Sequence, residues 1–370
     1  MTSYEWEIIA VGALVAAACA LPGTFLVLRK LSLMSDAITH TVLLGIVLAF
    51  FVVQDLSSPL LIGGAALVGL LTVYLVEVLK KSNKVAEDAA IGLVFPFLFS
   101  IAIILISRYA GSVHLDTDAV LLGEIALVPQ DRLMLGGRDL GPRAAWILGT
   151  VGLAGAAFIL GLFKELKLST FDPGLAEALG FRPAALNFWL MGLVSVTAVA
   201  AFDAVGSVLV VALMIGPPAA ALLLTNRLGA MLALSVLIGV LSAPAGYLAA
   251  RRLDVSIAGS MAAMIGLAFV ASFLLAPRRG LVAVGRRRMR QRWEFAQKML
   301  AAHLFNHEGT PEQRAESELA HIEATLNWNA TFRAKVVSRA MQRGLVTSGA
   351  STLILTDNGR EFARKALVHQ

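Results

Sequence analysis

Long apolar stretches separated by short polar segments make up most of the chain between residues 8 and 275. A helix needs about 20 apolar residues to cross the hydrocarbon core of a bilayer. Nine stretches approach that length, at 8–28, 36–53, 59–79, 88–107, 143–163, 184–203, 204–224, 228–250 and 255–275. Because no polar loop separates the sixth stretch from the seventh at Asp203, a count of eight stays open. Backbone groups in lipid must be satisfied within their own segment, so we expect an all-α polytopic membrane protein.

The composition agrees with this fold class. Apolar residues make up 58% of the chain and charged residues only 15%, whereas soluble domains carry about 25% charged residues. No basic residue precedes Arg29, so the first apolar stretch lacks the basic start of a cleavable signal peptide and is expected to be retained. The single Cys19 excludes a disulfide within the chain and is expected to be a packing residue.

The charge distribution divides the chain near residue 280. Residues 1–285 hold 17 basic and 17 acidic side chains, so the whole net charge of +6 belongs to residues 286–370. We therefore expect a transmembrane domain at 1–278, a basic juxtamembrane linker at 279–292 and a cytoplasmic domain at 293–370. Arginines concentrated in the linker are expected to contact anionic lipid headgroups: Arg286, Arg287, Arg288, Arg290 and Arg292.

The basic residues of alternate loops predict the orientation, because cytoplasmic loops are enriched in Lys and Arg. One set of loops is richer and includes the tail, which places the N-terminus outside the cell and the tail in the cytoplasm. That set contains Arg29, Lys30, Lys80, Lys81, Lys84, Lys164, Lys167, Arg182, Arg227, Arg278 and Arg279. The opposite set contains Arg108, Arg132, Arg138, Arg143, Arg251 and Arg252.

Asp36 and His40 are the main candidate metal ligands. Their i,i+4 spacing places both on one face of the second span. A carboxylate oxygen and an imidazole nitrogen suit manganese, iron and zinc, and charged residues within spans are commonly functional. The alternative is an ordinary helix start, with Ser35 or Asp36 as N-cap and His40 as a satisfied core residue.

Further polar residues are weaker candidates for the metal path. His114, Asp116 and Asp118 alternate in a loop expected to face outside, and Glu124 follows on a short apolar segment. Asp203 lies near the outer end of the sixth span. The alternative interpretations are a solvated loop with helix-capping acids and an interfacial polar residue.

The segment 164–180 predicts a short cytoplasmic helix. Asp172 is a plausible N-cap, Pro173 suits the first turn and Gly180 suits the stop. An apolar face is expected from Leu175, Ala178 and Leu179. Such a helix either lies on the membrane surface or docks a partner.

The sequence contains none of the common catalytic motifs. It has no Gly-x-x-x-x-Gly-Lys-Ser/Thr loop for phosphates, no Gly-x-Ser-x-Gly, no Cys-x-x-Cys and no His-Glu-x-x-His. We therefore expect no enzyme activity and no permanently bound cofactor. If ATP drives transport, a separate polypeptide hydrolyses it.

Four segments resemble, in order, the permease subunits of manganese/zinc/iron ABC importers over roughly residues 8–278. They are LRKLSLMSDAITH at 28–40, LGE at 122–124, STFDPGLA at 169–176 and VGSVLVVALMIGP at 205–217. The chain departs from the family pattern at Thr39, where the family usually has serine before the histidine. The resemblance implies a type II ABC importer fold, similar to that of the vitamin B12 and siderophore permeases.

The same resemblance implies the function, the partners and the roles of residues. The permease would pair with a second copy or a paralogue, dock cytoplasmic ABC ATPases that use ATP, and receive metal from an extracytoplasmic binding protein. Asp36 and His40 match the metal pathway. Residues matching the ATPase-coupling helix are Phe171, Asp172, Pro173, Leu175, Ala178, Leu179 and Gly180. The transported divalent metal is expected to be manganese, because the path lacks thiol ligands, with zinc or iron as alternatives.

The tail predicts helices at 290–306, 310–326 and 329–343, a hairpin from 345–348 and 352–356, and a last helix. This is a winged-helix order, and SELA at 317–320, RGLV at 343–346 and LTDNGREFA at 355–363 resemble the DNA-binding domain of diphtheria-toxin-repressor-type metalloregulators. From Glu294 onward the tail has nine basic and eight acidic residues, so specific DNA binding is not expected. The ligands of those regulators cannot be matched to His303, His307 or His321. His303 and His307, at i,i+4, could still bind metal.

Two alternative functions stay open. One is a membrane-tethered winged-helix regulator. The other is an ion-coupled secondary metal transporter, in which Asp36, Glu124 or Asp203 would carry protons. An ATPase gene and a metal-binding lipoprotein gene beside this one would favour the ABC importer.

Overall fold

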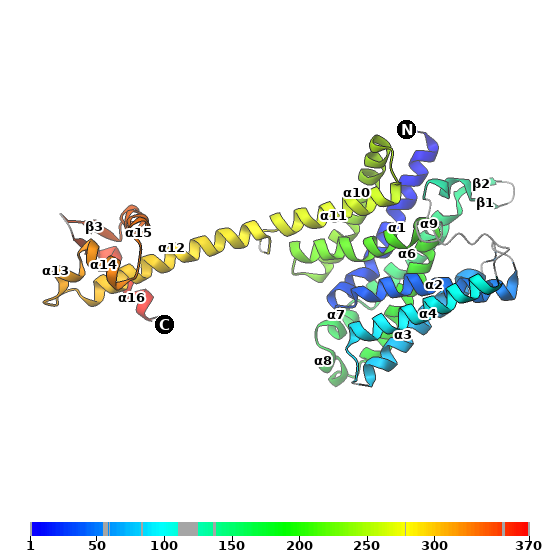
Figure 1. The fold of residues 1–370 in the computed structure, drawn as a ribbon, viewed down its shortest axis with the longest axis horizontal. Coiled ribbons are helices and arrows are strands. Elements are labelled where there is room, and N and C mark those ends of the chain that lie inside the picture. Colours follow the sequence, from blue (N-terminus) through cyan, green and yellow to red (C-terminus); the bar gives the residue numbers. More distant parts are fainter. Residues whose placement is uncertain are drawn as a thin grey trace. The chain divides into compact units, whose positions relative to one another are not determined.

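The computed structural model describes residues 2–54, 58, 60–82, 84–109, 125–135, 138–277, 279–349 and 352–368. The chain forms two compact units, Met1–Gly280 and Leu281–Gln370. Helices dominate both units, and the strands form two small antiparallel pairs (Figure 1). The predicted all-α polytopic membrane fold is confirmed.

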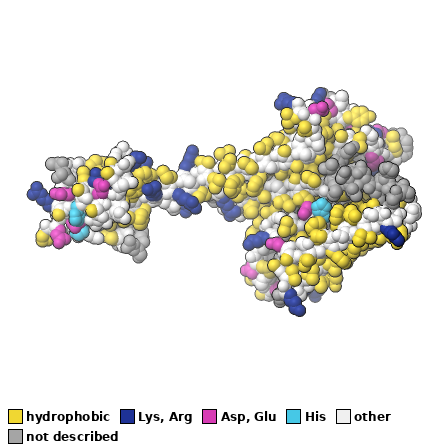
Figure 2. All heavy atoms as spheres, viewed as in Figure 1, with side chains coloured by type: hydrophobic (Ala, Val, Ile, Leu, Met, Phe, Trp, Pro, Cys, Tyr) yellow, Lys and Arg dark blue, Asp and Glu magenta, His cyan; other side chains and the backbone are white. Residues whose placement is uncertain are grey.

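The first unit is a bundle of long apolar helices. Eight of its described helices are long and apolar enough to cross a membrane, and apolar side chains cover much of its visible surface (Figure 2). These eight are α1 (Ser3–Leu28), α2 (Ser32–Val53), α3 (Leu60–Lys81), α4 (Glu87–Tyr109), α6 (Arg143–Gly161), α9 (Pro183–Leu224), α10 (Leu228–Leu253) and α11 (Ile257–Leu275). The shorter elements are η1 (Ile125–Gln130), β1 (Arg132–Leu135), β2 (Arg138–Pro142), α7 (Phe163–Phe171) and α8 (Pro173–Ala178).

Helix α9 changes direction at Gly206, whose φ of 76° and ψ of 166° are not helical. Asn187 in its first arm accepts a hydrogen bond from Arg29, which follows α1. Met214 in its second arm has its carbonyl oxygen 2.0 Å from where a Cβ on Gly23 would be. In an uninterrupted helix residues 187 and 214 would be roughly 40 Å apart. They instead both lie near the C-terminal end of α1, so the second arm runs back along the bundle.

The number of spans is therefore corrected in one respect. Nine span helices were expected, with a boundary at Asp203 and a count of eight left open. The described residues contain eight helices long and apolar enough to span, and the break falls at Gly206 inside one of them. Because α9 passes along the bundle twice, these eight helices run along it nine times.

Close backbone approaches hold the bundle together. Helix α1 packs against α6, α9 and α10 (Figure 1). Gly23 allows the Met214 backbone to approach α1, and Gly45 of α2 allows the same for Gly64 of α3. In lipid such small-residue contacts replace hydrophobic burial as the source of helix association. Around them, Phe25, Ile38 and other large side chains are completely buried.

Two polar clusters mark the opposite ends of the bundle, which we call the Glu7 end and the Arg29 end. At the first, the Arg132 guanidinium donates to both carboxylate oxygens of Glu7, at 3.1 and 3.2 Å, and to Asp139 at 2.5 Å. At the second, Arg29 donates to residues of α7 and α9. Helix α2 begins at the Arg29 end.

The second unit contains α12 (Leu281–Asn306), α13 (Gln313–Glu316), α14 (Leu319–Thr325), α15 (Ala330–Gln342), β3 (Val346–Ser348), β4 (Leu353–Leu355) and α16 (Asp357–Val368). Its core includes Leu300, Ile322, Val336 and Ala363. The strands pair antiparallel, with Val346 opposite Leu355. The order of three helical regions, a hairpin and a last helix is the predicted order. The winged-helix resemblance itself stays a prediction.

Two predicted boundaries in this unit are wrong. Helix α12 begins at Leu281 rather than at residue 290, so the arginine run belongs to a helix that enters the predicted linker. The predicted helix 310–326 is divided into α13 and α14. The division falls at Glu318, whose extended backbone forms a β-bridge with Thr352.

Candidate functional site

Asp36 and His40 lie on α2, near the Arg29 end of the bundle. The helix begins at Ser32 without a side-chain cap, so neither Ser35 nor Asp36 is the N-cap that the alternative interpretation required. Ser35 is buried, with its hydroxyl 3.1 Å from the Met214 sulfur. One turn apart, the Asp36 carboxylate and the His40 Nε2 are separated by 3.4 Å. The i,i+4 pair predicted from the sequence is therefore present as a paired oxygen and nitrogen.

The surroundings of the pair leave it accessible. The Asp36 side chain is 43% exposed and that of His40 is 28% exposed. The imidazole lies beside two aromatic rings of α4, with centroids 5.5 Å away for Phe95 and 5.7 Å for Phe99. A buried hydrogen bond of 2.8 Å between Thr72 and Thr41 ties the next residue of α2 to α3. The carboxylate is therefore not covered by the helices of this chain, while aromatic packing and α3 fix the helix that carries it.

The structure does not bring Asp203 to this pair. Asp203 is exposed, three residues before the reversal of α9. Arg143 and Asp131, at the Glu7 end, are the charges that act on it. Asp36 is one turn from the opposite end. The other weak candidates, His114, Asp116, Asp118 and Glu124, lie outside the described residues.

Arg29 is a residue that the sequence reasoning did not single out. Its guanidinium donates to Asn187 at 2.7 Å, Ser169 at 3.0 Å and Thr170 at 3.2 Å. Burial lowers the pKa of this arginine. It joins the ends of α1, α7 and α9 beside a cleft of about 440 Å³ that is also lined by Glu77. A charge at the end of a span, close to a polar segment, is the only sequence signal that could have indicated this role.

Helix α8 forms as predicted from its capping residues. The Asp172 carboxylate accepts a hydrogen bond from the Leu175 backbone at 3.0 Å, and Pro173 occupies the first turn. Gly180 ends the segment with a φ of +85°. Only Ala176 of this helix is buried, and it anchors α8 to the bundle.

The remaining apolar side chains of this segment face outward. Phe171 is 61% exposed, Leu175 47% and Leu179 61%, and Ala178 is exposed as well. Leu175 and Leu179 are four residues apart, and Phe171 ends α7 just before the non-helical Asp172. We call these three exposed apolar side chains the α8 surface. The α8 segment and the cleft at Arg29 both lie at the Arg29 end of the bundle, since Pro173 also lines that cleft.

In the second unit, three arginines in or directly after α15 interact with other parts of the fold. Arg339 lies over the Trp293 ring, 4.0 Å from its centroid, and Arg343 donates to Gln297 at 2.8 Å. Arg333 pairs with Glu323. Arginines that are engaged by neighbouring helices offer little free charge for phosphates, whereas Lys335 of the same helix is exposed. The absence of specific DNA binding stays a prediction.

Known proteins similar to this chain are transport permeases. Residues 3–276 match the ABC 3 transport family. The chain is 46% identical to the zinc transport system membrane protein TroD of Treponema pallidum over 362 residues, which covers 98% of each protein. It is 50% identical to the manganese transport system membrane protein MntD of Bacillus subtilis over 280 residues, which covers 76% of this chain and 95% of MntD.

Solved structures give the same picture of the membrane unit. PsaBC from Streptococcus pneumoniae, solved in complex with Fab, superposes with a TM-score of 0.63 at 29% identity, covering 75% of this chain and 94% of that chain. An inward-facing putative metal-chelate type ABC transporter superposes with a TM-score of 0.55 at 19% identity, covering 72% and 84%. The second likeness concerns the fold alone.

Proposed function

Because this chain belongs to the ABC 3 transport family, we propose that it is the membrane-spanning permease of an ATP-driven importer of manganese or zinc. It is a multi-pass protein of the cell membrane and not itself an enzyme, since the ATPase of such transporters is a separate subunit. The similarity to zinc and manganese permeases supports this function over the tethered regulator and the ion-coupled transporter. Manganese as the preferred cargo stays a prediction, because the relative similar over the whole chain is named for zinc.

The transported cation is proposed to contact Asp36 and His40. The observation that carries this proposal is the accessible oxygen–nitrogen pair at 3.4 Å, on a helix fixed by its neighbours. Two protein ligands do not fill the coordination shell of a divalent transition metal, which takes at least four. Water or a second permease copy would complete it. The weaker candidates His114, Asp116, Asp118, Glu124 and Asp203 would contact the cation earlier, as it arrives from an extracytoplasmic binding protein.

The α8 surface is proposed to dock the cytoplasmic ABC ATPase. Exposed apolar side chains clustered on a rigid short helix are the usual anchors of a protein interface. Arg29 holds the segment immediately before α8 to α1 and α9, so a displacement of α8 would reach both helices. This assignment makes the Arg29 end cytoplasmic and the Glu7 end external. The richer basic content of loops at the Arg29 end supports that orientation.

Metal uptake tests the pathway assignment directly. The double variant Asp36→Asn with His40→Ala, expressed with its ATPase and binding protein in cells lacking other importers, is expected to lose manganese and zinc uptake. The amount of folded permease should stay the same, because both side chains are partly exposed. Asp254→Asn is the matched control, since this carboxylate is at the exposed end of α10. Near-normal uptake by a well-expressed double variant would contradict the assignment.

A further inference from the structure

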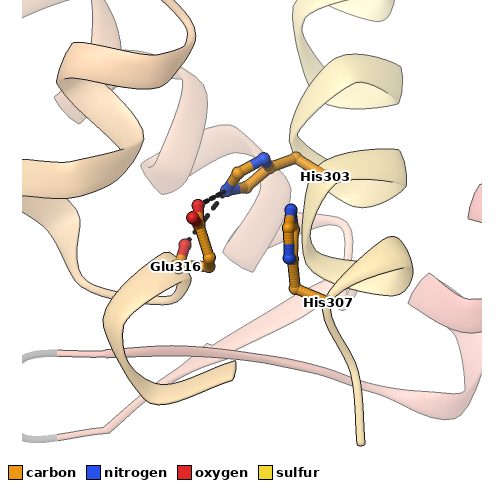
Figure 3. Close-up of side chains that lie close together, drawn as sticks. All are labelled: His303, His307 and Glu316. Carbon is orange, nitrogen blue, oxygen red and sulfur yellow. Dashed lines mark hydrogen bonds and ion pairs between the residues drawn. The ribbon is translucent and has the colours of Figure 1, made fainter. Parts of the chain in front are cut away.

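A second group of metal-binding side chains lies in the C-terminal unit, apart from the transport pathway. His303 and His307 stand one turn apart near the end of α12, and Glu316 ends α13 (Figure 3). One ligand atom from each of the three lies within 4.8 Å of the others. Figure 3 shows both imidazoles on the side of α12 that faces the glutamate.

The glutamate is held in an unusual hydrogen-bonding state. Its Oε2 is buried and accepts no hydrogen bond, although the His303 Nε2 lies 3.3 Å away. That imidazole nitrogen is 3.1 Å from the Glu316 backbone carbonyl oxygen instead. The other carboxylate oxygen lies 3.0 Å from Nε2 of His321, on α14. A buried carboxylate oxygen without a hydrogen bond is unfavourable unless a cation or a donor satisfies it.

We propose that His303, His307 and Glu316 bind a divalent transition-metal ion, with His321 as the residue that positions the glutamate. Two imidazoles and one carboxylate form a ligand set typical of zinc, with water in the remaining position. Ligands about 2.0–2.1 Å from a tetrahedral zinc ion are about 3.3 Å apart, which is the separation already present between His303 and Glu316. The His307 ring has its centroid 5.0 Å from that of His303, and one of its nitrogens lies within 4.8 Å of the other two ligand atoms.

The positions of the ligands in the fold indicate what binding would do. His303 is in the last turn of the long helix α12 and His307 directly follows that helix, whereas Glu316 belongs to the short helix after the turn. A metal ion would therefore join the end of α12 to α13 and close the connection between them. Since the ligand side chains come from separate segments, the ion would bind the folded unit more strongly than the unfolded chain.

Metal binding by the full-length protein in detergent tests the proposal. The Asp36→Asn/His40→Ala protein serves as background, so that the transport pathway contributes no metal binding. Equilibrium dialysis against zinc is expected to give about one tightly bound ion per chain. Adding His303→Ala and His307→Ala should remove it, and adding His369→Ala, a matched histidine loss elsewhere in the chain, should not. An unchanged stoichiometry and affinity in the variant lacking His303 and His307 would overturn the site, as would a background protein that retains no zinc.

Two further variants separate loss of ligands from loss of fold. Glu316→Gln keeps the side-chain shape, so the metal-free melting temperature should stay the same while zinc affinity falls. His321→Ala should weaken binding about 10- to 100-fold. The visible absorption spectrum of bound cobalt should persist in this variant, because a positioning residue is not a ligand. A cobalt spectrum identical in the background protein and in Glu316→Gln would remove the glutamate from the ligand set. These readouts do not depend on transport, so a failure here leaves the proposed import function intact.

Discussion

Arg29 carries a positive charge into a largely buried position, where only a well-placed set of acceptors can stabilise it. Ser169, Thr170 and Asn187 supply those acceptors from two other helices. A guanidinium reaches all three because three different nitrogens donate in fixed, divergent directions, whereas the three N–H donors of an ammonium group share one nitrogen atom.

We predict that Arg29→Lys keeps the charge but loses at least one of these hydrogen bonds. Each hydrogen bond to a charged group contributes about 1.5–3 kcal/mol, so the detergent-solubilised protein should melt at a lower temperature. The metal uptake rate should fall by more than the loss of folded protein explains, because α8 would be less firmly connected to α1. Lys167→Arg, on the exposed side of α7, is the control and should behave like the wild type. Unchanged melting and uptake in Arg29→Lys would contradict the role assigned to this arginine.

At the residue scale, the sequence predicted local pairs and missed distant ones. Asp36 and His40 could be recognised because helical spacing alone places them on one face. The partners of Arg29 are 140 to 158 residues away, so no local pattern indicates them. The glutamate that faces His303 is only 13 residues away, but the turn after α12 brings it there, and helical spacing does not predict that turn.

Among the elements, α9 changes direction at a single glycine, Gly206. At Gly206 the backbone adopts a conformation that is essentially restricted to glycine, in the middle of 42 residues assigned as one helix. The apolar pattern continues through this point without a polar loop. The sequence therefore predicted two spans but placed their boundary at Asp203.

Gly206→Ala is expected to destabilise the protein by about 1–3 kcal/mol, the usual cost of a side chain in such a backbone conformation. The yield of monodisperse protein and its melting temperature would measure this effect. Gly229→Ala is the matched control, since Gly229 is in the first turn of α10 and a Cβ there would meet no other atom within 4 Å. If both alanine variants melt alike, the reversal does not depend on glycine.

Helix α8 gives a prediction for the docking surface. Leu175→Glu places a charge in the middle of the α8 surface, where the side chain is 47% exposed, so the permease itself should fold normally. A charge buried against an apolar pocket of the ATPase is costly, and we expect co-purification of the ATPase to fall at least tenfold. Leu175→Met retains an apolar side chain and should behave like the wild type. Full ATPase binding by Leu175→Glu would refute the docking assignment.

At the scale of the whole molecule, the two units differ in which similar proteins match them. The manganese permease MntD matches this chain over 280 residues, which is 95% of its own length, whereas TroD matches 98% of the chain including the C-terminal unit. The match to MntD is therefore long enough for the membrane unit but not for the whole chain, whereas the match to TroD includes the C-terminal unit.

Truncation after Gly280 should leave a folded membrane unit that still takes up metal. This boundary is preferable to one within the arginine run, because α12 is continuous from Leu281 to Asn306 and a cut there would expose half a helix. Size-exclusion chromatography and uptake would show whether the unit is intact, with the full-length chain as reference. Aggregation of the truncated protein, or complete loss of uptake at normal expression, would show that the C-terminal unit is required.

The reversal of α9 also determines on which side of the membrane the C-terminal unit is exposed to metal ions. The start of α1 and the end of α11 lie at opposite ends of the bundle. Arg251, at the end of α10, pairs with Glu5, whereas Arg279, just after α11, donates to Asn226 before the start of α10. On the proposed orientation, the histidine cluster at 303–321 lies in the compartment that receives the cargo. An ion bound there would report how much metal has already been delivered, rather than how much is available outside. The occupancy of this site would then depend on the metal that the permease has already imported.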